Sequence, residues 1–149
     1  MAKTSAGLVI YDNDFRILLV HPGGPYWEDI DSWSIPKGEM KAREDPLVTA
    51  LRESKEELGQ TLQGKMICLL GTFRQSKHKN VIAFAYKGTV TLPVQSNVIE
   101  IEWPRNSKKM IEISEVDKAE WFTSETALTK VHKGQRQIIE RFISIISIL

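Results

Sequence analysis

Three glutamates at helical spacing are the residues of this sequence best suited to chemistry. Glu53, Glu56 and Glu57 stand at positions i, i+3 and i+4, which share one face of a helix. Their like charges repel unless a cation lies between them, and Mg²⁺ prefers such carboxylate oxygens together with the phosphates of a substrate. The same pattern also describes an ordinary solvated helix face, so the three residues alone leave both interpretations open.

A helix that starts at Pro46 would hold these glutamates. Asp45 is a predicted N-cap, Pro46 suits the first helical position, and Gly59 stands where a C-terminal cap is expected. An apolar stripe is expected to anchor the helix to the core, chiefly through its leucines. The stripe consists of Leu47, Ala50, Leu51, Ser54 and Leu58.

The pattern continues on both sides of the helix. Gly38 is followed after five residues by Glu44, and after seven more by Arg52. This spacing resembles the signature of the Nudix hydrolase family. All seven invariant-type positions match: Gly38, Glu44, Arg52, Glu53, Glu56, Glu57 and Gly59. Ser54 and Gln60 depart from the signature, because the family usually has aliphatic residues at these two packing positions.

The resemblance implies a metal site and the reaction that it serves. Glu53, Glu56 and Glu57 are expected to bind Mg²⁺, with Mn²⁺ as a substitute ion, helped by the carbonyl of Gly38. Arg52 is expected to hold the carboxylates in register by pairing with Glu44, since an Arg–carboxylate pair can be bidentate. The implied reaction is hydrolysis of a pyrophosphate bond in a nucleoside diphosphate derivative, such as a nucleoside triphosphate or a dinucleoside polyphosphate.

The resemblance leaves the general base open. Glu53 is the first candidate to remove the proton of the attacking water. Many relatives instead place the base, or a further metal ligand, on a distant loop. Glu115 is the best candidate for that role here and Glu112 the second, although both also fit the description of solvated loop acids.

Substrate contacts are expected from three further places. Lys37, beside the signature, is a candidate for binding a phosphate, as is the cluster Lys77, His78 and Lys79. Tyr26 and Trp27, in a Gly- and Pro-rich loop, are candidates for stacking on a nucleobase, since an aromatic face accepts any base. Anchoring of that loop to the core is an equal alternative.

The rest of the chain predicts an α+β or α/β fold. Alternating and apolar runs predict strands at residues 7–11, 16–20, 33–35, 66–74, 81–86, 98–103 and 121–122. A C-terminal helical region starts near Ser124, includes His132, is interrupted at Gly134 and carries an apolar stripe that ends at Leu149. The family resemblance implies an α/β/α sandwich with a mixed sheet and the signature as a loop–helix–loop. Trp33, Trp103 and Trp121 are expected to be packing residues on strands.

Length and charge limit the other possibilities. The 149 residues suit one domain, residues 1–149. A formal charge of +1 gives no global field for nucleic acid, so long RNA is not an expected partner. The family resemblance implies a small nucleotide as the partner. No apolar run approaches the ~20 residues of a membrane span, so we expect a cytoplasmic protein with no membrane partner.

Two other functions remain open at this point. The chain fits a nucleotide-binding or regulatory module with little catalysis, and it also fits an RNA 5′-end pyrophosphohydrolase. The sequence does not choose between a monomer and a homodimer. Cys68 is its only cysteine, which excludes an internal disulfide and a multi-cysteine zinc site.

Overall fold

The computed structural model describes residues 2–148 and is built around a mixed six-stranded sheet. The strands are β1 (Lys3–Tyr11), β2 (Ile17–Pro22), β3 (Lys37–Glu39), β4 (Gln63–Ser76), β5 (Lys79–Thr89) and β8 (Val116–Phe122). Their order is β4-β5-β1-β2-β8, and β3 pairs with β1. The β1–β5 pairing is parallel, whereas β1–β2, β1–β3, β2–β8 and β4–β5 are antiparallel.

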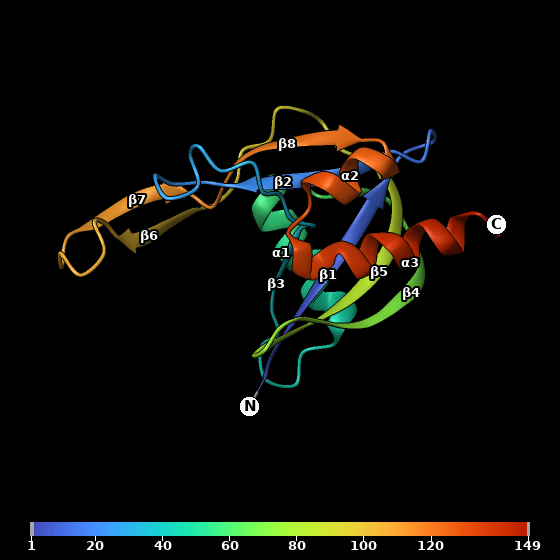
Figure 1. Cartoon of the computed structure of the whole chain (residues 1–149), viewed down its shortest axis with the longest axis horizontal. Helices are drawn as coiled ribbons and strands as arrows, with labels where there is room; N and C mark the ends of the chain where they lie inside the picture. The colour runs from blue at the N-terminus through green and yellow to red at the C-terminus, as the bar shows by residue number, and fades with distance from the viewer. Residues whose placement is uncertain (1, 149) are drawn as a thin grey trace.

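Helices cover both faces of this sheet, which confirms the predicted α/β/α arrangement (Figure 1). On one face lies α1 (Pro46–Leu58). On the other lie α2 (Ser124–Lys130), the 3-10 turn η1 (Lys133–Gln135) and α3 (Arg136–Ile146). Strands β6 (Val98–Glu102) and β7 (Met110–Ser114) form a separate hairpin that projects away from the sheet (Figure 1).

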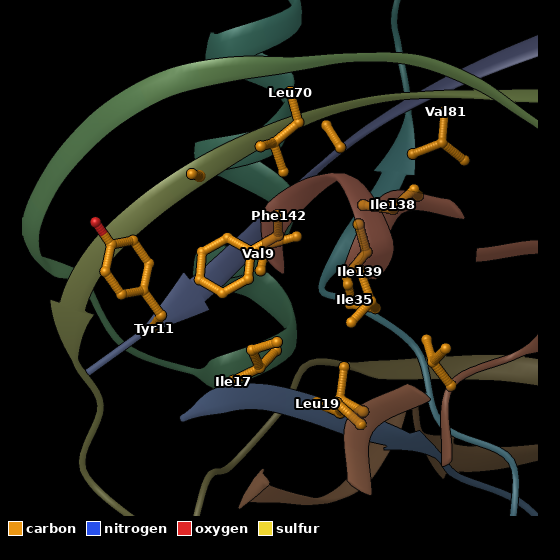
Figure 2. Packing of buried hydrophobic residues seen from close by; sticks show 14 of the residues in the cluster. Val9, Tyr11, Ile17, Leu19, Ile35, Leu70, Val81, Ile138, Ile139 and Phe142 are labelled. Atoms are coloured by element: carbon orange, nitrogen blue, oxygen red, sulfur yellow. The ribbon is translucent and has the colours of Figure 1, made fainter. Parts of the chain in front are cut away.

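Successive side chains of β1 point to opposite faces of the sheet and contribute to a hydrophobic core on each face. Leu8 and Ile10 belong to the cluster under α1, whereas Val9 and Tyr11 belong to the cluster under α3. Figure 2 shows Phe142 of α3 packed among the side chains of this second cluster. A strand buried on both faces reads as a continuous apolar run, as residues 7–11 do.

Most predicted elements are present, several of them longer than predicted. The hairpin of β1 and β2 has Ile10 opposite Leu18, and the predicted strands 66–74 and 81–86 lie inside β4 and β5. Their connecting turn is only residues 77–78. The predicted pair 121–122 is the end of β8.

Four predictions were wrong in detail. Residues 33–35 form isolated bridges from Trp33 and Ser34 in place of a strand, and β3 follows at residues 37–39. Trp103 lies in the bend after β6, and β7 was not predicted at all. His132 lies between α2 and η1, where the C-terminal region is broken just before Gly134.

The core-facing side of α1 also differs from the predicted stripe. Ala50, Ser54 and Leu58 are fully buried and Leu47 packs at the edge of the core, but Leu51 is 37% exposed. Leu149, the last residue of the predicted C-terminal stripe, lies outside the described residues. None of the helices within residues 2–148 combines the length and the apolar character that crossing a membrane requires.

Candidate active site

Three carboxylates from two distant parts of the chain meet at one point. Glu53 and Glu57 come from α1, and Glu115 comes from the bend between β7 and β8. Each offers one oxygen, and these oxygens lie within 4.8 Å of one another. This carboxylate trio contains two of the signature glutamates and the distant-loop acid that the sequence ranked first.

The other two candidate acids are not members of the trio. The Glu56 carboxyl group is 43% exposed and lies 3.5 Å from Nη1 of Arg52. Glu56 also lines a cleft of about 760 Å³ between α1 and residues 95–97. Glu112 is exposed on β7. Glu56 therefore borders the trio from the cleft side, whereas Glu112 is not part of it.

A series of backbone hydrogen bonds fixes Glu115 relative to α1. The N–H of Asn97 donates to the carbonyl of Glu56 at 3.0 Å, and the N–H of Glu115 donates to the carbonyl of Asn97 at 3.0 Å. The carbonyl of Glu115 in turn accepts from the N–H of Gly23 at 2.9 Å. These bonds hold the backbone of Glu115 against α1, so the position of Glu115 in the trio is fixed by the fold.

Glycine at position 38 makes room for Glu53. A Cβ added to Gly38 would overlap the carboxylate of Glu53, so any side chain there would push that carboxylate away. Gly38 lies on β3, which pairs with β1 at Ala6, so its backbone is fixed by the sheet. Glycine at position 38 therefore allows the carboxylate of Glu53 to take its place in the trio.

Arg52 and Glu44 form the bidentate pair that the signature implies. Nε of Arg52 donates to Oε2 of Glu44 and Nη2 donates to Oε1, both at 2.9 Å. Nη1 of Arg52 donates to Oε1 of Glu53 at 2.8 Å, so one guanidinium joins the signature loop to the trio. Thr49 adds a 2.6 Å hydrogen bond to Glu44, and this set of bonds holds the pKa of Glu44 far below its usual range.

Crowding and burial raise the pKa values of two members of the trio. Burial raises the pKa of Glu57 well above its usual value, and the charges of Glu115 and Glu53 raise it further. Burial also raises the pKa of Glu53, against the hydrogen bond from Arg52. The trio is costly to ionise without a counter-charge, and this is the condition that a bound divalent cation relieves.

Three lysines and one histidine form a group that begins at Lys37, beside the trio. Burial lowers the pKa of Lys37, while the carboxylate of Glu57 opposes that effect. Burial lowers the pKa of His132, and the charges of Lys37, Lys133 and Lys79 lower it further. These four residues come from β3, η1, β5 and the segment between α2 and η1. The sequence singled out Lys37 and Lys79 but not His132 or Lys133, because only the fold brings His132 near Lys37.

Two residues have structural roles that the sequence did not reveal. His21 is buried, and its ring nitrogens lie 2.8 Å from Oδ1 of Asp117 and 2.7 Å from the carbonyl of Ile30. Gln60 occupies an aliphatic position of the signature, yet its side-chain amide exchanges two hydrogen bonds with the backbone of Thr91. His21 thus ties the loop of residues 22–33 to β8, and Gln60 ties the end of α1 to residue 91.

Comparison of the sequence with known proteins gives one family and one curated relative. Residues 1–142 match the model of the NUDIX domain. A 58-residue segment is 40% identical to CMP-5′-(N-acetyl-N-hydroxy-3-aminopropyl)phosphonate hydrolase from Streptomyces rubellomurinus. The segment is 39% of this chain and spans 28% of that relative.

Solved structures with the same fold include two proteins with low sequence identity. A C. elegans Ap4A hydrolase in a binary complex superposes with a TM-score of 0.73 at 23% identity, over 97% of this chain and 99% of the other. A MutT protein from Methanosarcina mazei Go1 superposes with a TM-score of 0.61 at 19% identity, over 96% and 94%. At such identities these likenesses establish the fold.

Proposed function

Because the chain belongs to the NUDIX domain family, we propose that it is a hydrolase that cleaves a pyrophosphate bond in a nucleoside diphosphate derivative with Mg²⁺ as cofactor. The observation that carries this proposal is the carboxylate trio, whose oxygens lie within 4.8 Å of one another. Mn²⁺ is the expected substitute ion, because it also accepts oxygen ligands.

The residues present fit a hard divalent cation. The trio offers only oxygen donors, and two of its members have pKa values raised by burial and by neighbouring negative charge. A cation there would favour the ionised forms, in keeping with the ligand preference of Mg²⁺. We propose Glu53, Glu57 and Glu115 as ligands, Glu56 as a ligand on the cleft side, and the carbonyl of Gly38 as a further donor.

When bound, the metal would withdraw charge from the phosphates and lower the pKa of a coordinated water. The residues of the protein would then position the carboxylates and the phosphates and accept the proton of the attacking water. Arg52 holds the carboxylate of Glu53 in place through its bond at 2.8 Å, while Glu44 fixes the guanidinium from the other side. Lys37 is proposed to bind a phosphate oxygen, where its positive charge offsets the negative charge of the substrate.

Glu53 and Glu115 are both proposed as candidates for the general base. Each has a carboxylate oxygen in the trio, so either is within reach of a water held there. Burial raises the pKa of Glu53, and a more basic carboxylate is a better proton acceptor. Glu112 is the weaker candidate, because it lies on the exposed surface of β7.

The substrate class rests on the similar proteins and on the site together. The three proteins named above are an Ap4A hydrolase, a hydrolase of a CMP phosphonate and a MutT protein, and the first two names contain a nucleotide joined through phosphorus. We propose a nucleotide-type substrate, either a nucleoside triphosphate or a dinucleoside polyphosphate. The cytoplasmic location expected from the sequence, the single domain and the choice between monomer and homodimer stay predictions.

A substrate panel with Mg²⁺ or Mn²⁺ tests the proposal. The panel would contain nucleoside triphosphates, dinucleoside polyphosphates, nucleotide sugars and 5′-triphosphorylated RNA, with products separated by chromatography. Turnover of a nucleotide that stops on addition of EDTA is the expected result. Nucleotide binding without turnover of any compound would instead favour a non-catalytic module, and turnover of RNA alone would favour the RNA-end hydrolase.

A further inference from the structure

An aromatic pocket lies between the loop of residues 22–33 and the outer end of the β6–β7 hairpin. Its volume is about 470 Å³. In Figure 1 this loop, coloured light blue, runs beside the projecting hairpin. The residues that line the pocket are Tyr26, Trp27, Ile101, Glu102, Trp103 and Arg105.

Both walls of the pocket are held in place by the structure below them. A Cβ on Gly24 would come within 2.7 Å of the Ile113 side chain, so the loop packs closely on β7. His21 fixes the loop at its start and at Ile30. On the other wall, the N–H of Trp103 donates to the carbonyl of Lys109 at 2.9 Å. The pocket is therefore preformed.

The pocket exposes aromatic faces that packing does not use. Tyr26 is 54% exposed, although its ring meets Trp27 edge to face at a centroid distance of 4.9 Å. Trp103, across from them, is partly exposed. Exposed rings on two facing and anchored segments suit a planar ring that inserts between them.

Of the two charged side chains that line the pocket, Arg105 is the one available to an anionic ligand. The carboxylate of Glu102 accepts hydrogen bonds from the N–H groups of Asn106 and Lys108, at 3.1 and 3.0 Å, so it serves the hairpin turn. Arg105 has no ion-pair partner among residues 2–148. Its guanidinium is thus available to a phosphate.

The position of the pocket links it to the carboxylate trio. Glu115 stands at the base of the hairpin, and β6 runs from Val98 to Glu102 toward the pocket. Four residues of strand cover roughly 13 Å, so a ligand that reaches both places must carry its ring well away from the metal-bound phosphates. A nucleoside joined to a chain of several phosphates has this shape.

We propose that this pocket binds the nucleobase of a nucleoside polyphosphate substrate, with Arg105 on a phosphate near the nucleoside; the inference rests on the proposed function. Tyr26 and Trp103 supply the stacking faces. Because stacking is tolerant of base identity, the pocket is expected to accept purines and pyrimidines.

Binding to the metal-free protein tests the pocket separately from turnover. With EDTA present, ADP, GDP, CDP and UDP are titrated into the full chain and followed by tryptophan fluorescence and calorimetry, with inorganic tripolyphosphate as the probe that has no base. Tyr26→Ala and Trp103→Ala should raise the dissociation constants of the nucleotides by about 5-fold or more and leave that of tripolyphosphate unchanged. Arg105→Ala should weaken nucleotide binding, whereas Lys109→Ala, on the same hairpin, should not.

Matched controls distinguish the loss of pocket contacts from general effects of substitution on the protein. Phe15→Ala removes an exposed aromatic side chain elsewhere and should leave all affinities unchanged. Trp103→Phe should keep most of the affinity, and thermal melts verify folding of each variant. Equal affinities in all variants, or no nucleotide binding by the wild type at millimolar concentration, would overturn the inference. Pocket-dependent binding with no turnover of any compound would refute the proposed hydrolysis alone.

Discussion

The Cα atom of Gly38 lies directly against the carboxylate of Glu53, so that the smallest added side chain would occupy the position of that carboxylate. One residue belongs to β3 and the other to α1. The contact therefore sets the distance between the sheet and the helix at the point where the trio forms.

Gly38→Ala is expected to lower kcat by about 100-fold, because a displacement of about 1 Å in a positioned group can cost that much. Steady-state kinetics on the best substrate of the panel, together with a thermal melt, measures this. Glu39→Ala changes the exposed neighbour on β3 and should keep full activity. Unchanged kcat in a folded Gly38→Ala protein would show that the position of Glu53 is not important for the reaction.

Glu57→Gln is expected to lower kcat by at least ~100-fold with little effect on folding, since it removes a negative ligand from a preorganised site. Titration with Mn²⁺, followed by electron paramagnetic resonance, should show a matching loss of metal affinity. Glu100→Gln, which changes an exposed glutamate on β6, is the control. Comparable turnover in the purified Glu57→Gln protein would contradict the assignment of the trio as the metal site.

Arg52→Lys is expected to lower activity about 10- to 100-fold, the usual range for a residue that orients ligands. Lysine keeps the charge but cannot make the two parallel bonds to Glu44 and the third to Glu53. The affinity for Mn²⁺ should fall together with kcat. Lys55→Arg on the same helix should leave both quantities unchanged. Equal activity of Arg52→Lys and the wild type would mean that a positive charge at position 52 is enough to orient Glu53.

The pH dependence of stability should identify Glu57 in the metal-free protein. Its pKa is raised in the folded state, so the stability that its protonated form contributes is fully present below about pH 4.5 and is lost as the pH rises through the folded pKa. Thermal melts in EDTA should therefore show a loss of stability above pH 4.5 that Glu57→Gln lacks. Parallel curves for the two proteins would show that the pKa of Glu57 is close to its ordinary value.

Ser54→Ala is expected to raise the free energy of unfolding by about 1 kcal/mol. The Ser54 hydroxyl is fully buried and has no hydrogen-bond partner among residues 2–148, and an unsatisfied buried polar group costs about 1–3 kcal/mol. Urea titration measures the change. Ser144→Ala, at an exposed position of α3, should give a clearly smaller effect, because it differs only in helix propensity.

Local signals were enough to place α1 and its signature. Asp45 accepts a hydrogen bond from the N–H of Leu47, and Gly59 adopts the left-handed conformation that ends the helix. Capping chemistry of this kind depends on a few adjacent residues, so the sequence contains it in full. The pairing of Arg52 with Glu44 was expected from the family resemblance, since the signature defines both positions.

Contacts between distant segments could not be derived in the same way. Spacing alone does not predict that Asn97 bridges Glu56 and Glu115, or that His132 lies near Lys37. Leu51 was misplaced because helical spacing allowed it on either edge of the buried stripe, and packing against the sheet decided the side. The five-residue strand β7 was missed, although Ile111 and Ile113 alternate with polar residues.

The hairpin of β6 and β7 combines a base fixed near α1 with an outer end that projects away from the sheet. Glu115 is locked at the base by Asn97 and Gly23, while the pocket residues Trp103 and Arg105 lie at the far end. Lengthening or shortening the two strands in register would shift Trp103 and Arg105 outward or inward relative to the loop of residues 22–33 and leave Glu115 where it is. Reach toward larger or smaller ligands could thus be adjusted in this protein without rebuilding the machinery that breaks the bond.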